Sequence, residues 1–219
     1  GRGADIQWEA PFGTMMPAYY ALYAQAYMAK HSLTHDDLMS VRIKSSTYGV
    51  INERAVYRKP VKPEDFKRGD PEAKLAGPVA WPLRVGDCCA NADGSSCIIL
   101  ANSEKANAVS KKPVWILGIG AASEAVNMAA RPNFTNGLSV GYAAAAQAYK
   151  MAGITTEDVK VAEVHDCFTI AEIMAYECLG FAPMGEGKQL IREKVTYKEG
   201  KIPVNVDGGL LSKGHPIGA

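Results

Sequence analysis

The stretch "VAEVHDCFTIAE" (residues 161–172) decides the fold class, because a strand pattern passes directly into a helix pattern within it. Polar residues just before it favour a short capped turn, and residues 159–164 then predict a strand. Thr169 and Glu172 match a T-x-x-E capping box, which predicts a helix that begins here and stops at Gly180. Ligands of α/β proteins bind at such strand ends, so the junction is the first candidate site.

Two side chains in this junction are chemically versatile. His165 follows the predicted strand, and a histidine there can act as a general base or donate a hydrogen bond to an oxyanion near neutral pH. Cys167 stands just before the predicted helix, where the helix dipole lowers the pKa of a thiol. A capped loop with a buried thiol and a hydrogen-bonded histidine explains the same residues, and this stretch alone does not separate the two interpretations.

Strand and helix patterns alternate outward from this junction. Apolar runs at residues 98–100 and 114–117 predict buried strands. The alanine-rich residues 137–153 predict a helix that stops at Gly153. Strands that alternate with helices predict an α/β sheet layered with helices.

The N-terminal part has a different character. Residues 14–30 predict a helix capped by Thr14, and residues 32–38 lead into a second, short helix. Residues 48–82 lack periodicity and hold five prolines and dense mixed charge, which predicts an extended loop that covers a site or a subunit contact. Basic side chains in this loop are candidates for contacts with phosphate groups, but the interleaved acidic residues favour a solvated loop. The basic residues are Arg54, Arg58, Lys59, Lys62, Lys67 and Arg68.

The stretch "VDGGLLSKGHPIGA" (residues 206–219) presents a second histidine. Gly208 and Gly209 allow a tight turn and close backbone approach, while Pro216 fixes the chain after His215. An ordinary loop histidine does not need so much conformational restriction, so this pattern favours a functional His215.

Composition excludes several classes of function. The chain has 219 residues, 47% of them hydrophobic, and a formal net charge of +1, so we expect no nucleic-acid partner and no membrane association. Five cysteines without C-x-x-C spacing predict reduced thiols in the cytoplasm, and no metal site is expected. The first residues carry neither a signal peptide nor a starting methionine, which fits a chain that begins within a longer protein.

At this point the chain resembles a family. The motif H-D-C-F (residues 165–168) and the stretch "NVDGGLLSKGHPIGA" (residues 205–219) resemble the two C-terminal active-site loops of thiolases, in the group that includes the sterol-carrier-protein type and archaeal acetyl-CoA acetyltransferases. Residues 82–106 resemble that group's strand leading out of the first half, and residues 9–28 resemble the start of the helical part of its loop domain.

The resemblance implies an α/β thiolase fold that is incomplete here. Residues 1–82 would form the loop domain and residues 83–110 the last part of the N-terminal half. Residues 111–219 would form the C-terminal half, cut off after the G-H-P turn. The implied function is that of an acyl-CoA C-acyltransferase, with coenzyme A and acyl-CoA as substrates and no covalently bound cofactor.

The resemblance also implies roles for three residues. His215 would activate a nucleophilic cysteine and help to bind the thioester oxygen. His165 would complete the oxyanion hole, directly or through a water molecule. Cys167 would be the acid and base at the substrate's α-carbon. We expect the nucleophile to lie outside this chain, and none of the other cysteines to take that role. These are Cys88, Cys89, Cys97 and Cys178.

Other interpretations and the partners remain open. The run "GIGAAS" (residues 118–123) matches a dinucleotide-binding pattern, although no acidic residue follows at the spacing needed for the ribose. A thiolase-fold retro-aldolase or lyase and a non-catalytic thiolase-like subunit are further alternatives. The family implies a homodimer or homotetramer, and archaeal relatives pair with a small OB-fold, zinc-ribbon subunit.

Overall fold

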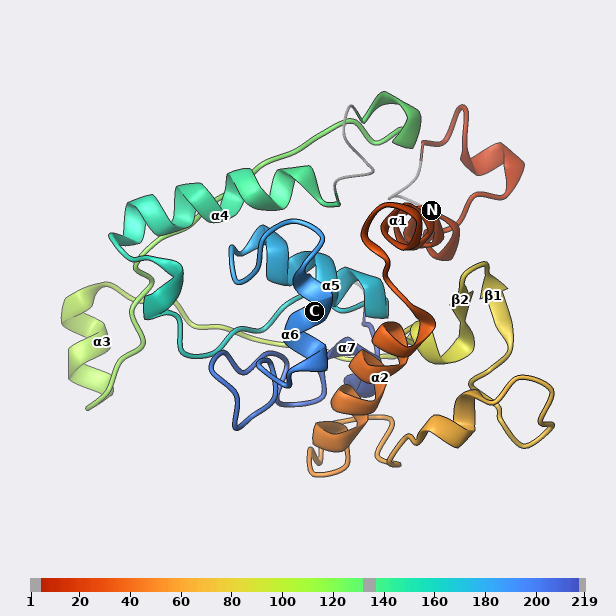
Figure 1. The fold of residues 1–219 in the computed structure, drawn as a ribbon. Helices are drawn as coiled ribbons and strands as arrows, with labels where there is room; N and C mark the ends of the chain where they lie inside the picture. The colour runs from red at the N-terminus through yellow and green to blue at the C-terminus, as the bar shows by residue number, and fades with distance from the viewer. Residues whose placement is uncertain (1–4, 132–136, 217–219) are drawn as a thin grey trace.

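The computed structural model describes residues 5–131 and 137–216, and helices dominate these residues (Figure 1). Helix α5 lies in the middle and contacts α1, α2, α4 and α6, while α2 also packs on α7. The helices are α1 (Met16–His31), α2 (His35–Gly49), α3 (Ser103–Val109), α4 (Ser139–Ala152), α5 (Thr169–Cys178), α6 (Gly187–Arg192) and α7 (Gly209–Lys213). Strands β1 (Pro78–Ala80) and β2 (Leu83–Arg84) pair antiparallel beside α1.

Short 3-10 helices join these elements. They are η1 (Ala10–Phe12), η2 (Pro63–Phe66), η3 (Val85–Asp87), η4 (Met128–Ala130) and η6 (Thr156–Asp158).

Helix α5 is the core of the described residues because it is buried on all sides. The side chains of Ile170, Ile173 and Met174 are fully buried. The helix begins at Thr169 as predicted, but the capping box is wrong. The Thr169 hydroxyl donates to Asp87 at 3.2 Å, and Glu172 bonds to distant side chains, because buried polar partners outweigh a local cap.

The two N-terminal helices are close to the prediction but differ at their starts. Helix α1 has Met15, not Thr14, at its N-cap, with no side-chain cap bond. Helix α2 is longer than predicted and begins with a capping box between Thr34 and Asp37. Arg192 of α6 binds Asp37 through two nitrogens at 2.6 and 2.7 Å, which ties the start of α2 to α6.

The predicted buried strands are wrong for the described residues. Residues 98–100 and 114–117 form no ladder, and the side chains of Ile99 and Val114 are 90% and 96% exposed. Residues 159–164 contribute one bridge, between Ala162 and Val204. A buried strand needs a neighbour on each edge and a layer on each face, and the described residues supply neither to these two segments.

The glycines of residues 118–123 have a packing role. A Cβ at Gly120 would lie 1.8 Å from the carbonyl oxygen of Ala144, and one at Gly118 would lie 2.3 Å from that of Ala148. These glycines therefore let the extended chain lie directly against α4. No helix begins at this run within the described residues, which contradicts the dinucleotide-binding interpretation.

Membrane insertion through a helix finds no support in the described part of the chain. None of its helices combines the length and apolar character needed to span a bilayer.

Candidate active site

The structure brings the two predicted histidines together. The ring centroids of His165 and His215 lie 5.0 Å apart, with the ring planes at 80°. His165 ends the extended segment before α5, and His215 follows α7 after Gly214. The turn that carries His215 and the H-D-C-F loop therefore form one site, although 50 residues of chain separate the two histidines.

Residues 88–92 join the two loops. The backbone N–H of Cys89 donates to the Cys167 carbonyl oxygen at 2.9 Å, and that of His215 donates to Ala90 at 2.8 Å. Isolated bridges pair Cys88 with Phe168 and Asn91 with His215. The sequence analysis did not predict that residues 88–92 join the two loops, because backbone pairing between residues 70 or more positions apart leaves no signal in the local sequence pattern.

Cys167 is buried and held as a thiol. Burial raises its pKa to about 12, although a hydrogen bond with the Tyr20 hydroxyl opposes this shift. The helix-dipole expectation of a lowered pKa is thus wrong, because desolvation of the thiolate outweighs it. The Tyr20 ring also stacks on Phe168 with centroids 4.5 Å apart, so this tyrosine of α1 contacts both Cys167 and its neighbour.

The two histidines differ in their surroundings. Burial and the neighbouring His215 lower the pKa of His165, so its imidazole is neutral at pH 7 and has one N–H to donate. The Nδ1 atom of His215 is buried and has no hydrogen-bond partner among the described residues. A neutral donor next to an imidazole nitrogen without a partner suits proton transfer beside an oxyanion.

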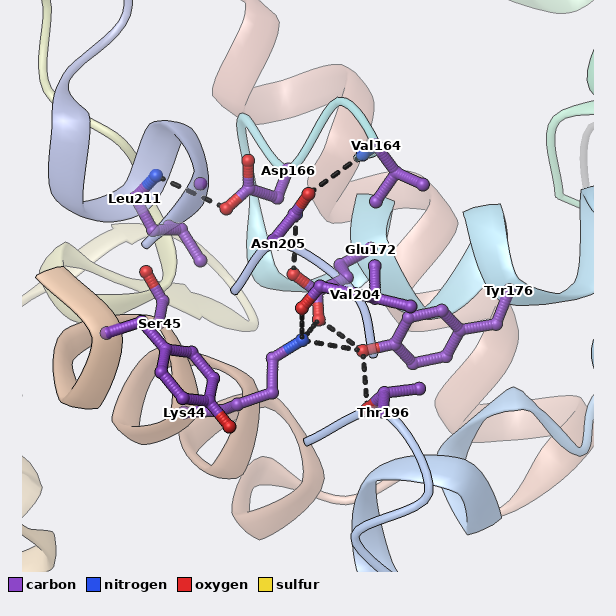
Figure 2. A network of polar contacts seen from close by, with 12 residues as sticks. Lys44, Ser45, Val164, Asp166, Glu172, Tyr176, Thr196, Val204, Asn205 and Leu211 are labelled. Carbon is purple, nitrogen blue, oxygen red and sulfur yellow. Dashed lines mark hydrogen bonds and ion pairs between the residues drawn. The ribbon is translucent and has the colours of Figure 1, made fainter. Parts of the chain in front are cut away.

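Beneath the loops lies a buried polar network, which Figure 2 shows. Lys44 of α2 forms an ion pair with Glu172 of α5, and both side chains are fully buried. The Lys44 ammonium also donates to the Val204 carbonyl oxygen at 2.8 Å and contacts the Tyr176 hydroxyl at 3.3 Å. Asn205 donates to Glu172 at 3.0 Å and accepts from the N–H of Val164 at 2.8 Å. This network fixes the extended segment that leads into His165.

The basic residues of the long loop converge only in part. Arg58 and Lys59 line a groove of about 630 Å³ together with the buried Arg42 and with Asp65. Arg68 lies in a different pocket, and Arg54, Lys62 and Lys67 line neither of these two cavities. Four of the six phosphate candidates thus lie outside the groove that holds Arg58 and Lys59.

The burial of Cys167 gives a first prediction. In the full-length protein at pH 8, iodoacetamide should alkylate native Cys167 about 1,000-fold more slowly than the same residue in the urea-unfolded protein, because a pKa near 12 leaves so little thiolate. Peptide mass spectrometry after timed labelling measures both rates. Comparable rates in the two states would show a reactive thiolate instead.

Comparison with known proteins places the chain in a family. A model of the family "Thiolase C-terminal domain-like" matches residues 120–219. The acetyl-CoA acetyltransferase of Methanothermobacter thermautotrophicus is 34% identical over 99% of this chain and 54% of its own length. The benzoylsuccinyl-CoA thiolase subunit BbsB of Thauera aromatica is 35% identical over 96% of this chain and 53% of its own length.

A lyase and an aldolase are also similar. The 17-hydroxy-3-oxo-4-pregnene-20-carboxyl-CoA lyase of Mycobacterium tuberculosis is 29% identical over 97% of this chain. A solved structure, the Ltp2-ChsH2(DUF35) aldolase, superposes with a TM-score of 0.79 at 27% identity over 93% of this chain and 53% of that one.

The chain spans about half the length of the curated relatives it matches. The predicted resemblance and the incomplete α/β thiolase fold are confirmed by these matches together. The chain belongs to the thiolase superfamily.

Proposed function

We propose that the protein is an acyl-CoA C-acyltransferase, which cleaves or forms 3-oxoacyl-CoA through an acyl-cysteine whose nucleophile lies outside these 219 residues. The observation that carries the proposal is the meeting of His165 and His215, 5.0 Å apart, at the loop that holds Cys167. Transfer of an acyl group needs a nucleophile, a proton donor for the carbanion and donors for the oxyanions.

In the first half-reaction of cleavage, each of the three candidate residues acts once. His215 takes the proton of the nucleophilic thiol, and the thiolate attacks the 3-oxo carbon of the substrate. The bond between the α-carbon and that carbonyl carbon breaks, and its electron pair passes to the α-carbon. Cys167 protonates the α-carbon, and the shortened acyl-CoA leaves. His165 donates to the thioester oxygen while negative charge develops there.

The second half-reaction returns both protons. The Cys167 thiolate takes the proton of the coenzyme A thiol, whose sulfur then attacks the acyl-cysteine. The nucleophilic sulfur leaves and recovers its proton from His215. A thiol with a pKa near 12 suits this role, because it gives its proton only to a strong base such as a carbanion.

Partners and location belong to the same proposal. Coenzyme A and acyl-CoA are the substrates, in the cytoplasm, and the protein is a homodimer or homotetramer. A small OB-fold, zinc-ribbon subunit is the proposed partner, supported by the DUF35 component named for the similar aldolase structure.

A retro-aldol lyase is the second candidate, supported by the similarity to the mycobacterial lyase and to the aldolase structure. Such cleavage passes through no acyl-cysteine. A thiolase and a lyase therefore differ in whether substrate leaves a covalent adduct on the protein.

Intact-protein mass spectrometry tests the choice. The full-length protein should gain the mass of an acetyl group after incubation with acetoacetyl-CoA, and lose it when coenzyme A is added. Cleavage of a 3-hydroxyacyl-CoA without any adduct would establish the lyase. If the protein forms no adduct and cleaves neither substrate, the remaining alternative is a non-catalytic thiolase-like subunit.

A further inference from the structure

Asp166 lies between His165 and Cys167 and takes no part in the proposed chemistry. Its side chain is fully buried and accepts hydrogen bonds from the backbone N–H of Leu210 at 2.6 Å and of Leu211 at 3.3 Å. Figure 2 shows this carboxylate turned toward the chain at Leu211. These N–H groups belong to the first turn of α7, where an α-helix offers no internal acceptor. The H-D-C-F loop is thus bonded directly to the helix that leads into His215.

Asp166 and Gly209 are in close contact. Gly209 has a φ of +56°, and a Cβ built there would lie 2.1 Å from a carboxylate oxygen of Asp166. A side chain at this position would therefore push the carboxylate away from α7. Glycine is required both for the backbone conformation and for the close approach of Asp166.

A displacement of α7 would move His215, because only Gly214 lies between the end of this helix and the histidine. The helix ends at Lys213, and the backbone N–H of His215 then donates to Ala90. From the other side, a guanidinium nitrogen of Arg42 donates to the Leu211 carbonyl oxygen. Asp166 and Arg42 therefore hold the same residue of α7 through its N–H and its carbonyl oxygen.

The surroundings of Asp166 disfavour its charged form. Burial and the nearby Glu172 raise its pKa to about 7, while the bonds from Leu210 and Leu211 oppose the shift. Arg42 of α2 is the cation that acts on Asp166, and Lys44 pairs with Glu172. The other titratable neighbours that sense the Asp166 charge are Tyr176, Cys89 and Cys167.

We propose that Asp166 is a positioning residue of the acyl-transfer site: its carboxylate bonds the H-D-C-F loop to the first turn of α7 and so sets the placement of His215 against His165 and Cys167. The kinetic part of this proposal rests on the proposed function. The geometric part rests on the contacts of Asp166 alone.

Substitutions at Asp166 in the full-length protein test the idea. Asp166→Asn keeps the shape but offers one acceptor oxygen, and Asp166→Ala offers none. In the alanine variant kcat for acetoacetyl-CoA cleavage should fall about 100-fold with KM unchanged, because misplaced groups slow the chemistry without weakening substrate binding. The asparagine variant should retain an intermediate kcat, since Leu210 keeps its acceptor.

Asp158→Asn is the matched control. Asp158 also accepts from a backbone N–H, that of Thr155 at 2.8 Å, but it lies in η6 away from the histidines. Its asparagine variant should keep the wild-type kcat. Equal losses of thermal stability at both positions with unchanged kcat in the Asp166 variants would show a purely structural residue and overturn the proposal.

A second readout does not depend on catalysis. Diethyl pyrocarbonate should modify His215 about tenfold faster in Asp166→Ala than in the wild type, the factor expected when a buried hydrogen bond is lost. The Asp158→Asn variant should react at the wild-type rate. Should the wild-type protein form no acyl-enzyme, the proposed function fails and this labelling still decides the role of Asp166. Equal labelling in all three proteins would refute it.

Discussion

Replacing Lys44 by methionine is expected to lower the free energy of unfolding by about 3–5 kcal/mol, the largest stability effect that the described residues predict. Lys44 and Glu172 are both fully buried, so methionine would leave the glutamate charge without a counterion. Methionine has a similar length, so the loss would come from the charge and from the bonds to Val204 and Tyr176, not from a cavity.

Urea unfolding of the full-length protein, followed by circular dichroism, measures this effect. Lys67→Met is the matched control, because Lys67 is exposed in the long loop, and it should change stability by less than about 0.5 kcal/mol. The double variant Lys44→Met/Glu172→Gln should recover much of the loss, because the neutral amide can still accept from Asn205. A loss near that of the control would mean that water reaches the pair.

The signals that point to the three candidate site residues are local in the sequence. The strand-to-helix junction identified His165 and Cys167, and the glycine-rich turn identified His215. The structure then brought the loops together, with the two histidine rings 5.0 Å apart. Resemblance to a family supplied the remaining step, since periodicity cannot tell that two loops face each other.

The supports of the site were not predictable in the same way. Lys44 lies beyond residues 32–38, the segment that predicts the approach to a short helix, and its partner Glu172 follows 128 residues later. A buried lysine breaks the apolar pattern on which burial predictions depend. Glu172 does not act as the predicted capping residue, because the T-x-x-E pattern describes only a local bond, whereas the distant Lys44 and Asn205 bind this carboxylate.

The two apolar runs show that composition can also predict burial where the described residues provide none. Residues 98–100 and 114–117 have the composition of buried strands, yet they are exposed in the described part of the chain. Apolar composition shows only that a segment is able to lie in a core. Whether the segment is buried depends on packing partners from other parts of the protein. The similar proteins are about twice as long, which is where such neighbours can come from.

Removing His215 should separate its role from that of Cys167. In the full-length protein, His215→Ala should slow acyl-enzyme formation from acetoacetyl-CoA about 1,000-fold while the protein remains folded, because no other group takes the proton of the nucleophile. Rapid-quench mass spectrometry measures this step. His31→Ala is the control, since His31 ends α1 and packs against Tyr27, and it should acylate normally.

Cys167→Ala should show the complementary pattern. It should still acylate from acetyl-CoA, because coenzyme A can leave as its thiolate without a proton from Cys167. It should lose exchange of the α-protons of acetyl-CoA with deuterated solvent, because the group that moves protons at the α-carbon is gone. Normal exchange in this variant would assign that role to a residue beyond these 219, and normal acylation in His215→Ala would remove the histidine from the first step. The two substitutions thus test the two half-sites separately, since a thiol pKa near 12 suits Cys167 for a carbanion and not for attack on a thioester.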